Sequence, residues 1–177
     1  MMITPRIAAA ALIASTLGFA TAAQAEPVTP ANQADHFMGL FTDAGNDCID
    51  SKKLTDAERA PSCETALSEL ANRRKALAAP SIAELANLDF YEAFMQIAVA
   101  NAYSHIDGAV SKRTCIAAER SWTLDNKLML IPKAALGPDF YEAYHSVPEA
   151  VNRVLSECRD HFGTPADGAP LPESKAS

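Results

Sequence analysis

Motifs for catalysis and for cofactor binding are missing from this chain of 177 residues. It has no G-x-S-x-G nucleophile elbow, no phosphate-binding loop, no dinucleotide fingerprint and no H-E-x-x-H pair. None of the four cysteines stands in a C-x-x-C pair, so neither a thioredoxin-type redox pair nor a c-type haem is indicated. Alternating runs of Val, Ile and Thr, which predict β-strands, are also absent. We therefore expect an all-α protein that is not an enzyme and that binds no cofactor and no metal.

Positive charge is scarce near the N-terminus, which has the three parts of a secretory signal. Arg6 is the only charged residue before position 26, residues 7–20 are apolar, and Ala23-Gln24-Ala25 offers small residues where a signal peptidase cuts. The apolar stretch is shorter than the roughly 20 residues of a bilayer-spanning helix, although an uncleaved N-terminal anchor is the alternative. We predict removal of residues 1–25, a mature chain that begins at Glu26, and a periplasmic or secreted protein.

Acidic residues outnumber basic ones in the predicted mature chain. Removing Arg6 leaves 14 basic and 22 acidic residues, and changes the net charge from −7 to −8. Nucleic acids and anionic membranes bind clustered Lys and Arg, so we expect neither as a partner. We also expect no membrane span once the signal is removed.

The four cysteines, Cys48, Cys63, Cys115 and Cys158, all follow the predicted signal. An even number of cysteines in an exported chain predicts disulfides, and three pairings are open. In a stack of helical hairpins, the helix of Cys63 packs on the segment before it and the helix of Cys115 packs on a later one. We therefore predict the bridges Cys48–Cys63 and Cys115–Cys158. A bridge at Cys158 removes the alternative of a metal site with His161, which needs a free thiolate.

Helical periodicity and capping patterns divide the mature chain into amphipathic segments. One clear apolar stripe begins at Ser62 and ends at Pro80. Capping patterns occur at Thr55-x-x-Glu58, Ser81-x-x-Glu84 and Asp89-x-x-Glu92, and the last opens the run 90–103, in which three polar residues interrupt apolar ones. A helix that is apolar on nearly every face must be covered by others, so we predict that this is the central buried helix. Within it, Phe90-x-x-x-Phe94 has the spacing of a core contact.

Two stretches about fifty residues apart are alike. Asp89-Phe-Tyr-Glu-Ala-Phe94 matches Asp139-Phe-Tyr-Glu-Ala-Tyr144 at five of six positions, and the intervals 63–80 and 115–132 each run from a cysteine to a proline. A chance match of the hexamer is the alternative to a tandem duplication. Repeated helical units bury their apolar faces by stacking. We therefore predict a small stack of antiparallel helical hairpins with two units of about 50 residues, stapled by disulfides.

The segment Asn101-Ala-Tyr-Ser-His-Ile-Asp-Gly108, followed by a helix, resembles the helix-turn-helix of tetratricopeptide repeat proteins over residues 101–125. The spacing after Tyr103 departs from that family's pattern, and the repeat is longer than the family's period of about 34 residues. The resemblance implies an α-hairpin stack that binds proteins, with no particular ligand.

A partner surface must come from the outer helices if the central helix is covered. Arginine, tryptophan and tyrosine contribute most to the energy of protein interfaces. For the single tryptophan, Trp122, a core or edge position is favoured over a ligand platform, although its residue type also suits an interface. The candidate surface residues are Arg113, Arg120, Trp122, Tyr141 and His145.

We thus expect a signal peptide at 1–25, a single all-helical domain at 26–163 and a disordered tail at 164–177, where the composition has no apolar period. The expected function is an exported protein-interaction module without catalytic activity, whose partner is another exported protein. The alternative is an inhibitor or immunity-type protein that binds one exported enzyme.

Overall fold

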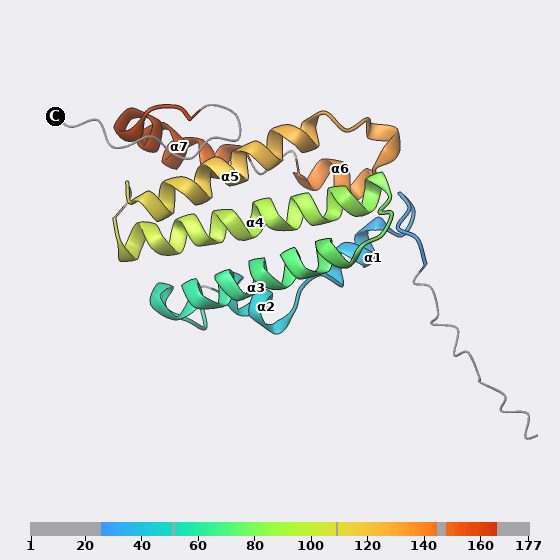
Figure 1. Cartoon of the computed structure of the whole chain (residues 1–177), viewed down its shortest axis with the longest axis horizontal. Helices are drawn as coiled ribbons and strands as arrows, with labels where there is room; N and C mark the ends of the chain where they lie inside the picture. Colours follow the sequence, from blue (N-terminus) through green and yellow to red (C-terminus); the bar gives the residue numbers. More distant parts are fainter. Residues whose placement is uncertain (1–25, 51, 109, 145–147, 166–177) are drawn as a thin grey trace, which may run out of the picture.

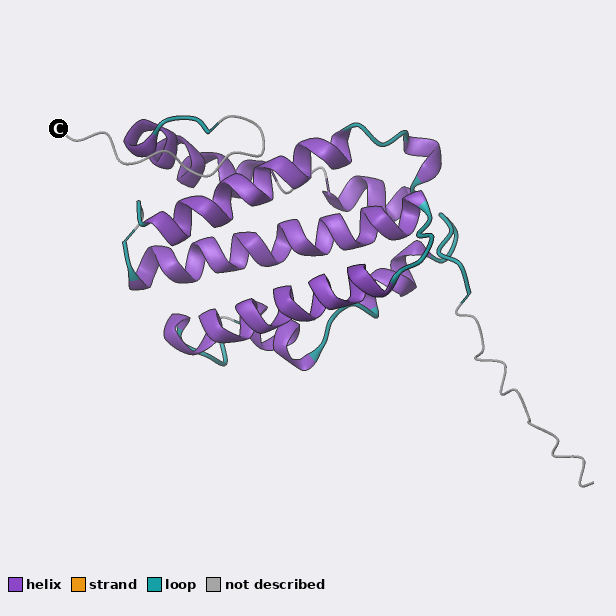
Figure 2. Cartoon of the chain, viewed as in Figure 1, coloured by secondary structure: helices purple, strands orange, loops and turns teal. Residues whose placement is uncertain are grey.

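The computed structural model describes residues 26–50, 52–108, 110–144 and 148–165, and all regular structure in these ranges is helical (Figures 1 and 2). Three long helices lie side by side. Helix α4 (Ile82–Ile106) is in the middle, between α3 (Asp56–Ala76) and α5 (Lys112–Met129). The predicted all-α, disulfide-stapled stack is confirmed.

Short helices surround this layer. On the α3 side, α2 (Asp43–Ile49) packs against α3, and α7 (Pro148–Phe162) packs against α5 on the other side. Helices α1 (Gln33–Met38) and α6 (Pro138–Tyr144) meet near the N-terminal end of α4, and a 3-10 turn, η1 (Lys133–Ala135), precedes α6. None of the described helices is long and apolar enough to cross a membrane. The predicted signal peptide, and the predicted tail from residue 166 onward, lie outside the described residues.

Helix α4 is the buried centre that its composition predicts, since 14 of its 25 residues are buried. Of the two predicted caps, the one at Asp89 is wrong and the one at Ser81 is confirmed. The Ser81 hydroxyl accepts a hydrogen bond from the Glu84 N–H (3.1 Å), so the helix begins at Ile82. Asp89 lies inside the helix and is 2% exposed. The pattern misled because the same three-residue spacing that forms a capping box also places two side chains on one face of a helix interior.

The predicted contact between Phe90 and Phe94 is also revised. Phe90 is buried, with 8% of its surface exposed, whereas Phe94 is 36% exposed. The Phe90 ring packs instead against Phe37 of α1 and Phe140 of α6, with centroid distances of 5.1 Å to each. Phe90 and Phe140 are equivalent positions of the repeated hexamer, so the two copies meet at these rings.

Helix α3 begins six residues before the predicted start at Ser62. The Glu58 carboxylate accepts hydrogen bonds from the backbone N–H (2.9 Å) and the hydroxyl (2.7 Å) of Thr55, the residue before the helix. These two bonds, the backbone one first, lower the pKa of Glu58. Pro61 therefore stands inside the helix, although prolines usually mark a boundary. The cap at Thr55, rather than the proline, sets where the helix starts.

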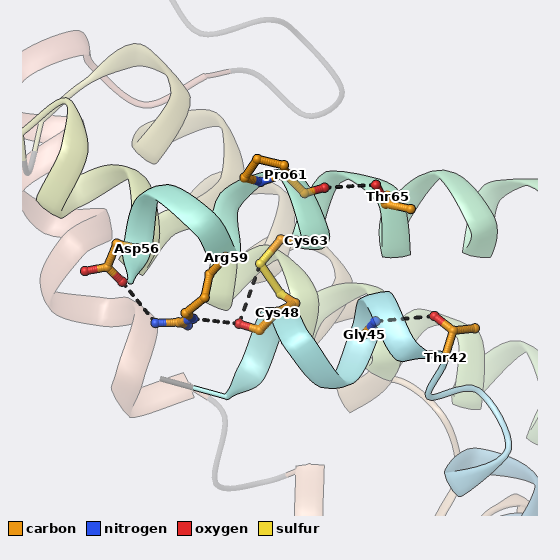
Figure 3. Close-up of a disulfide and its surroundings, with 8 residues drawn as sticks. All are labelled: Thr42, Gly45, Cys48, Asp56, Arg59, Pro61, Cys63 and Thr65. Atoms are coloured by element: carbon orange, nitrogen blue, oxygen red, sulfur yellow. Dashed lines mark hydrogen bonds and ion pairs between the residues drawn. A yellow bond between two sulfur atoms is a disulfide. The ribbon is translucent and has the colours of Figure 1, made fainter. Parts of the chain in front are cut away.

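Both predicted disulfides are confirmed. Cys48–Cys63 joins α2 to α3, with Cα atoms 4.6 Å apart (Figure 3), and Cys115–Cys158 joins α5 to α7 with Cα atoms 5.4 Å apart. All four cysteines have no exposed surface. Beside the first bridge, Arg59 Nε donates a hydrogen bond of 2.8 Å to the Cys48 carbonyl (Figure 3). Each bridge thus fixes one short helix to one outer long helix.

Candidate functional site

Two carboxylates on α4 form ion pairs with three cations from the neighbouring helices. Asp89 and Glu92 lie on one face of α4, and Arg74 of α3 contacts both. Its Nη2 is 2.9 Å from Asp89 Oδ1 and 3.0 Å from Glu92 Oε2. From α5, Lys127 Nζ lies 2.5 Å from Asp89 Oδ2, and Arg120 Nη2 lies 2.7 Å from Glu92 Oε1. These five side chains, called the ion-pair cluster below, join the three long helices.

Within the ion-pair cluster the carboxylates are more deeply buried than the cations. The side chains of Asp89 and Glu92 are 2% and 14% exposed, while those of Arg74, Arg120 and Lys127 are 30%, 49% and 59% exposed. A buried carboxylate without partners costs several kcal/mol, so the cations are needed where they stand. The outer surface of the cluster is therefore positive, with the negative charge beneath it.

Polar contacts continue along α4 toward its C-terminal end. The Tyr103 hydroxyl donates a short hydrogen bond to Glu64 of α3, and the Arg113 guanidinium of α5 lies 5.0 Å from the centre of the Tyr103 ring. The hydrogen bond to Glu64, followed by burial, raises the pKa of Tyr103 above its usual value of 10.0. Two residues on, His105 Nδ1 lies 2.7 Å from Asp56 Oδ2 of α3. Polar side chains thus bridge α4 to its neighbours in its N-terminal half and again near its C-terminal end.

One stripe of α5 is exposed along its length and contains three cations. Arg113, Arg120 and Lys127 are spaced by seven residues, which places them on one side of the helix. Two further exposed residues share this stripe, and neither is acidic. We call the stripe the α5 row, and its members are Arg113, Ile116, Arg120, Thr123 and Lys127. At 1.5 Å per residue, the α5 row is about 21 Å long.

Helix α7 covers a different side of α5. Cys115 is bonded to Cys158, and Glu119 receives two hydrogen bonds from Arg159, from Nε at 2.7 Å and from Nη2 at 2.9 Å. The same guanidinium lies 4.3 Å from the centre of the Trp122 ring. Positions 115, 119 and 122 follow one another at helical spacing, so the contact with α7 has its own stripe. The α5 row lies outside that stripe.

The structure separates the predicted surface residues. Arg113 and Arg120 share the α5 row, whereas Trp122 lies half-buried on the side of α7. Tyr141 belongs to α6, where Lys133 Nζ lies 4.6 Å from its ring centre. His145 lies outside the described residues.

Lys127, Ile116 and Arg74 belong to this surface or to the ion-pair cluster, but they are not among the site residues predicted from the sequence. Lys127 completes the seven-residue spacing of the two arginines, so its position in the α5 row was visible in the sequence. Ile116 falls on the same stripe, but apolar side chains are usually inside, so its residue type gave no sign of an exposed position. The pairing of Asp89 with Arg74 and Lys127 could not be predicted from the sequence, because these two cations come from two other helices.

A small cavity lies beside α4, where α3 meets the start of α2. It has a volume of about 40 Å³ and is lined by Leu40, Thr42, Ala66, Glu69, Leu70, Arg73 and Tyr91. Tyr91 is 1% exposed, and its hydroxyl has no hydrogen-bond partner among the described residues. Burial, with a contribution from Glu69, raises its pKa. The volume suits one or a few water molecules, whereas small-molecule sites measure roughly 300–1,000 Å³.

Metal ligands are not grouped in the part of the chain that the structure describes. There, no three His, Cys, Asp or Glu side chains lie together in a way that could hold a metal ion. Cys158, considered above with His161, has its sulfur in a disulfide.

Comparison of the chain with models of known protein families found no match, and neither did comparison with curated proteins or with solved structures. The tetratricopeptide resemblance therefore stays a prediction.

Proposed function

We propose that this protein is an exported interaction module without catalytic activity, which binds another protein through the α5 row. The observation that carries the proposal is Ile116, which is 49% exposed on the helix stripe that also holds Arg113 and Arg120. Arginine is enriched at interface hot spots, and the exposed isoleucine beside two arginines offers a partner apolar and charged contacts together.

The scaffold supports this proposal because it holds the α5 row in place before any partner arrives. The ion-pair cluster ties α5 to α4 and α3, and Cys115–Cys158 ties the far side of α5 to α7. A surface that is already ordered loses less conformational entropy on binding. Binding energy is therefore not consumed in ordering the helix.

Export is tested by the intact mass of the protein recovered from the extracytoplasmic fraction of cells that produce it. We expect a chain that begins at Glu26 and contains two disulfides. Two disulfides fit an oxidising compartment, which supports export. A membrane-bound chain that retains residues 1–25 would contradict it.

Binding is tested by placing a photo-crosslinking amino acid at position 116 and, in a second variant, at position 49. Ile49 of α2 is also an exposed isoleucine (37%), so it controls for nonspecific capture. We expect one protein to be captured from position 116 alone, and to form a complex with this chain when both are purified. Equal capture from the two positions, or no complex between the purified proteins, would contradict the proposal. If the captured protein is an enzyme and is inhibited at one-to-one stoichiometry, the inhibitor alternative replaces the general module.

A further inference from the structure

We infer that the partner offers the α5 row an acidic helical segment, with carboxylates about seven residues apart around an apolar side chain. This inference rests on the proposed function, and it names the chemistry of the segment that the α5 row binds. It follows from three properties of the row. Its cations have N–H donors left for a partner, the cations recur at a constant interval along the helix, and the surrounding acidic residues disfavour a broad anionic partner.

The cations of the α5 row retain hydrogen-bonding capacity beyond their contacts with α4. Arg120 uses Nε (2.8 Å) and Nη2 (2.7 Å) on one oxygen of Glu92, and Arg113 faces the ring of Tyr103. A guanidinium has five N–H donors and an ammonium has three, so these contacts occupy only part of each cation. Carboxylates are the protein groups that bind such donors most strongly. Because the carboxylates of α4 lie below the cations, a partner's carboxylates can approach them from above.

The geometry of the row favours a helix as the binding segment. Its cations recur at a seven-residue interval over about 21 Å, and Ile116 lies between the first two. A second helix laid along α5 repeats its side chains with the same period, as helices do in coiled coils. Acidic residues at that interval meet Arg113, Arg120 and Lys127 in turn, and an apolar residue after the first of them meets Ile116.

The surroundings of the row favour a narrow partner over a broad anionic surface such as a membrane. The whole chain has a net charge of −7. On the neighbouring α3, Glu64 is exposed, and Asp107 is exposed beyond the end of α4. The carboxylates of Asp89, Glu92 and Glu64 lie close to the row's cations, so a partner's carboxylates reach the remaining N–H donors only from a segment that lies along the row itself. An anionic lipid surface would meet the acidic residues as well.

The test uses the folded mature chain and two synthetic helical peptides of about 15 residues. One peptide has Glu at seven-residue intervals and a Leu positioned for Ile116, and the other has Gln in place of each Glu. We expect the Glu peptide to bind at least about tenfold more tightly in low salt, with affinity that falls as salt is added. In NMR titrations of the isotope-labelled protein, the shifts are expected at the α5 row.

A pair of matched variants locates the binding site. Arg113→Gln with Ile116→Gln removes one cation and one exposed isoleucine from the row, and we expect it to weaken the Glu peptide about tenfold. Lys52→Gln with Ile49→Gln removes the same two kinds of side chain near α2, and we expect unchanged affinity. Arg120 and Lys127 are left intact because they pair with buried carboxylates. Circular dichroism and thermal unfolding establish that both variants are folded.

Several results would overturn the inference. Equal binding of the Glu and Gln peptides, or shifts away from the α5 row, would do so directly. The row would be assigned to a membrane if the protein bound vesicles of anionic lipid but not the peptide, and if the variant at Arg113 and Ile116 lost that vesicle binding. Self-association that the same variant abolishes would assign it to a second copy of this chain. A crosslinked partner that binds at position 116 through a neutral or basic segment would overturn this inference but not the proposed function. Peptide binding without any protein partner would count against the proposed function.

Discussion

Lys127 of α5 reaches from solvent to a carboxylate that solvent barely touches. Its Nζ lies 2.5 Å from Asp89 Oδ2, although the lysine side chain is 59% exposed and the aspartate side chain is 2% exposed. The methylene stem of the lysine spans this difference, which lets one residue serve both the interior and the surface. The same side chain therefore stabilises the contact between α4 and α5 and forms one end of the α5 row.

Lys127→Met should destabilise the protein by about 1–3 kcal/mol, because Asp89 would retain Arg74 as its only cation among the described contacts. Urea unfolding measures the change. Lys112→Met removes an exposed lysine at the start of the same helix and should change stability by less than about 0.5 kcal/mol. Equal effects of the two substitutions would show that the buried pair contributes nothing specific.

Replacing Cys115 and Cys158 together by Ala should cost about 2–4 kcal/mol. The sequence separation in this bridge is 43 residues, against 15 for Cys48–Cys63, so loop entropy predicts a larger loss here by about 1 kcal/mol. Urea unfolding of the two double variants compares them, and hydrogen exchange should show the loss of protection mainly in α7. A larger loss from the shorter loop would mean that native packing, rather than chain entropy, decides the order.

Phe90→Ala should cost about 3–5 kcal/mol through the cavity that it leaves against Phe37 and Phe140. Phe94→Ala should cost only about 1–2 kcal/mol, because more than a third of that side chain is already exposed. Thermal and urea unfolding of the two variants give the comparison. Similar losses would contradict the different burial of the two rings.

Stability should fall as the pH rises above about 10. The hydrogen bond to Glu64 raises the pKa of Tyr103, and burial raises that of Tyr91, so the folded chain keeps both protons to a higher pH than the unfolded chain does. This contribution is complete below the unfolded pKa and is lost as pH rises through the folded values. Urea midpoints measured between about pH 9 and 11 test it. Tyr91→Phe combined with Tyr103→Phe should flatten the slope, and an unchanged slope would assign it to other groups.

Much of the fold could be predicted from local patterns. The run 90–103 is too apolar to lie anywhere but the centre, and the cysteine pairing follows once each cysteine is placed on its helix. The charge pairs could not be predicted in this way. Asp89 finds its cations on two other helices, so its role depends on how the helices pack, and its spacing to Glu92 suits a cap as well as a helix interior.

The candidate surface was half visible in the sequence. Arg113 and Arg120 were selected by residue type, and the seven-residue interval to Lys127 would have added the third cation. Trp122 was selected by type as well, but a tryptophan on a helix has no sequence signal for which neighbour will cover it. Only the packing of α7, with Arg159 against the indole, places it away from the arginines.

Each disulfide joins a cysteine to the next cysteine along the chain, and neither closed loop contains any part of α4. A chain that meets an oxidase from its N-terminal end would therefore form Cys48–Cys63 while Cys115 and Cys158 are still unavailable for pairing. The remaining two thiols would then have only each other. Oxidation in order of appearance produces the native bonds directly, so the protein should reach its native state without a disulfide isomerase, and neither bridge has to wait for the central helix to be in place.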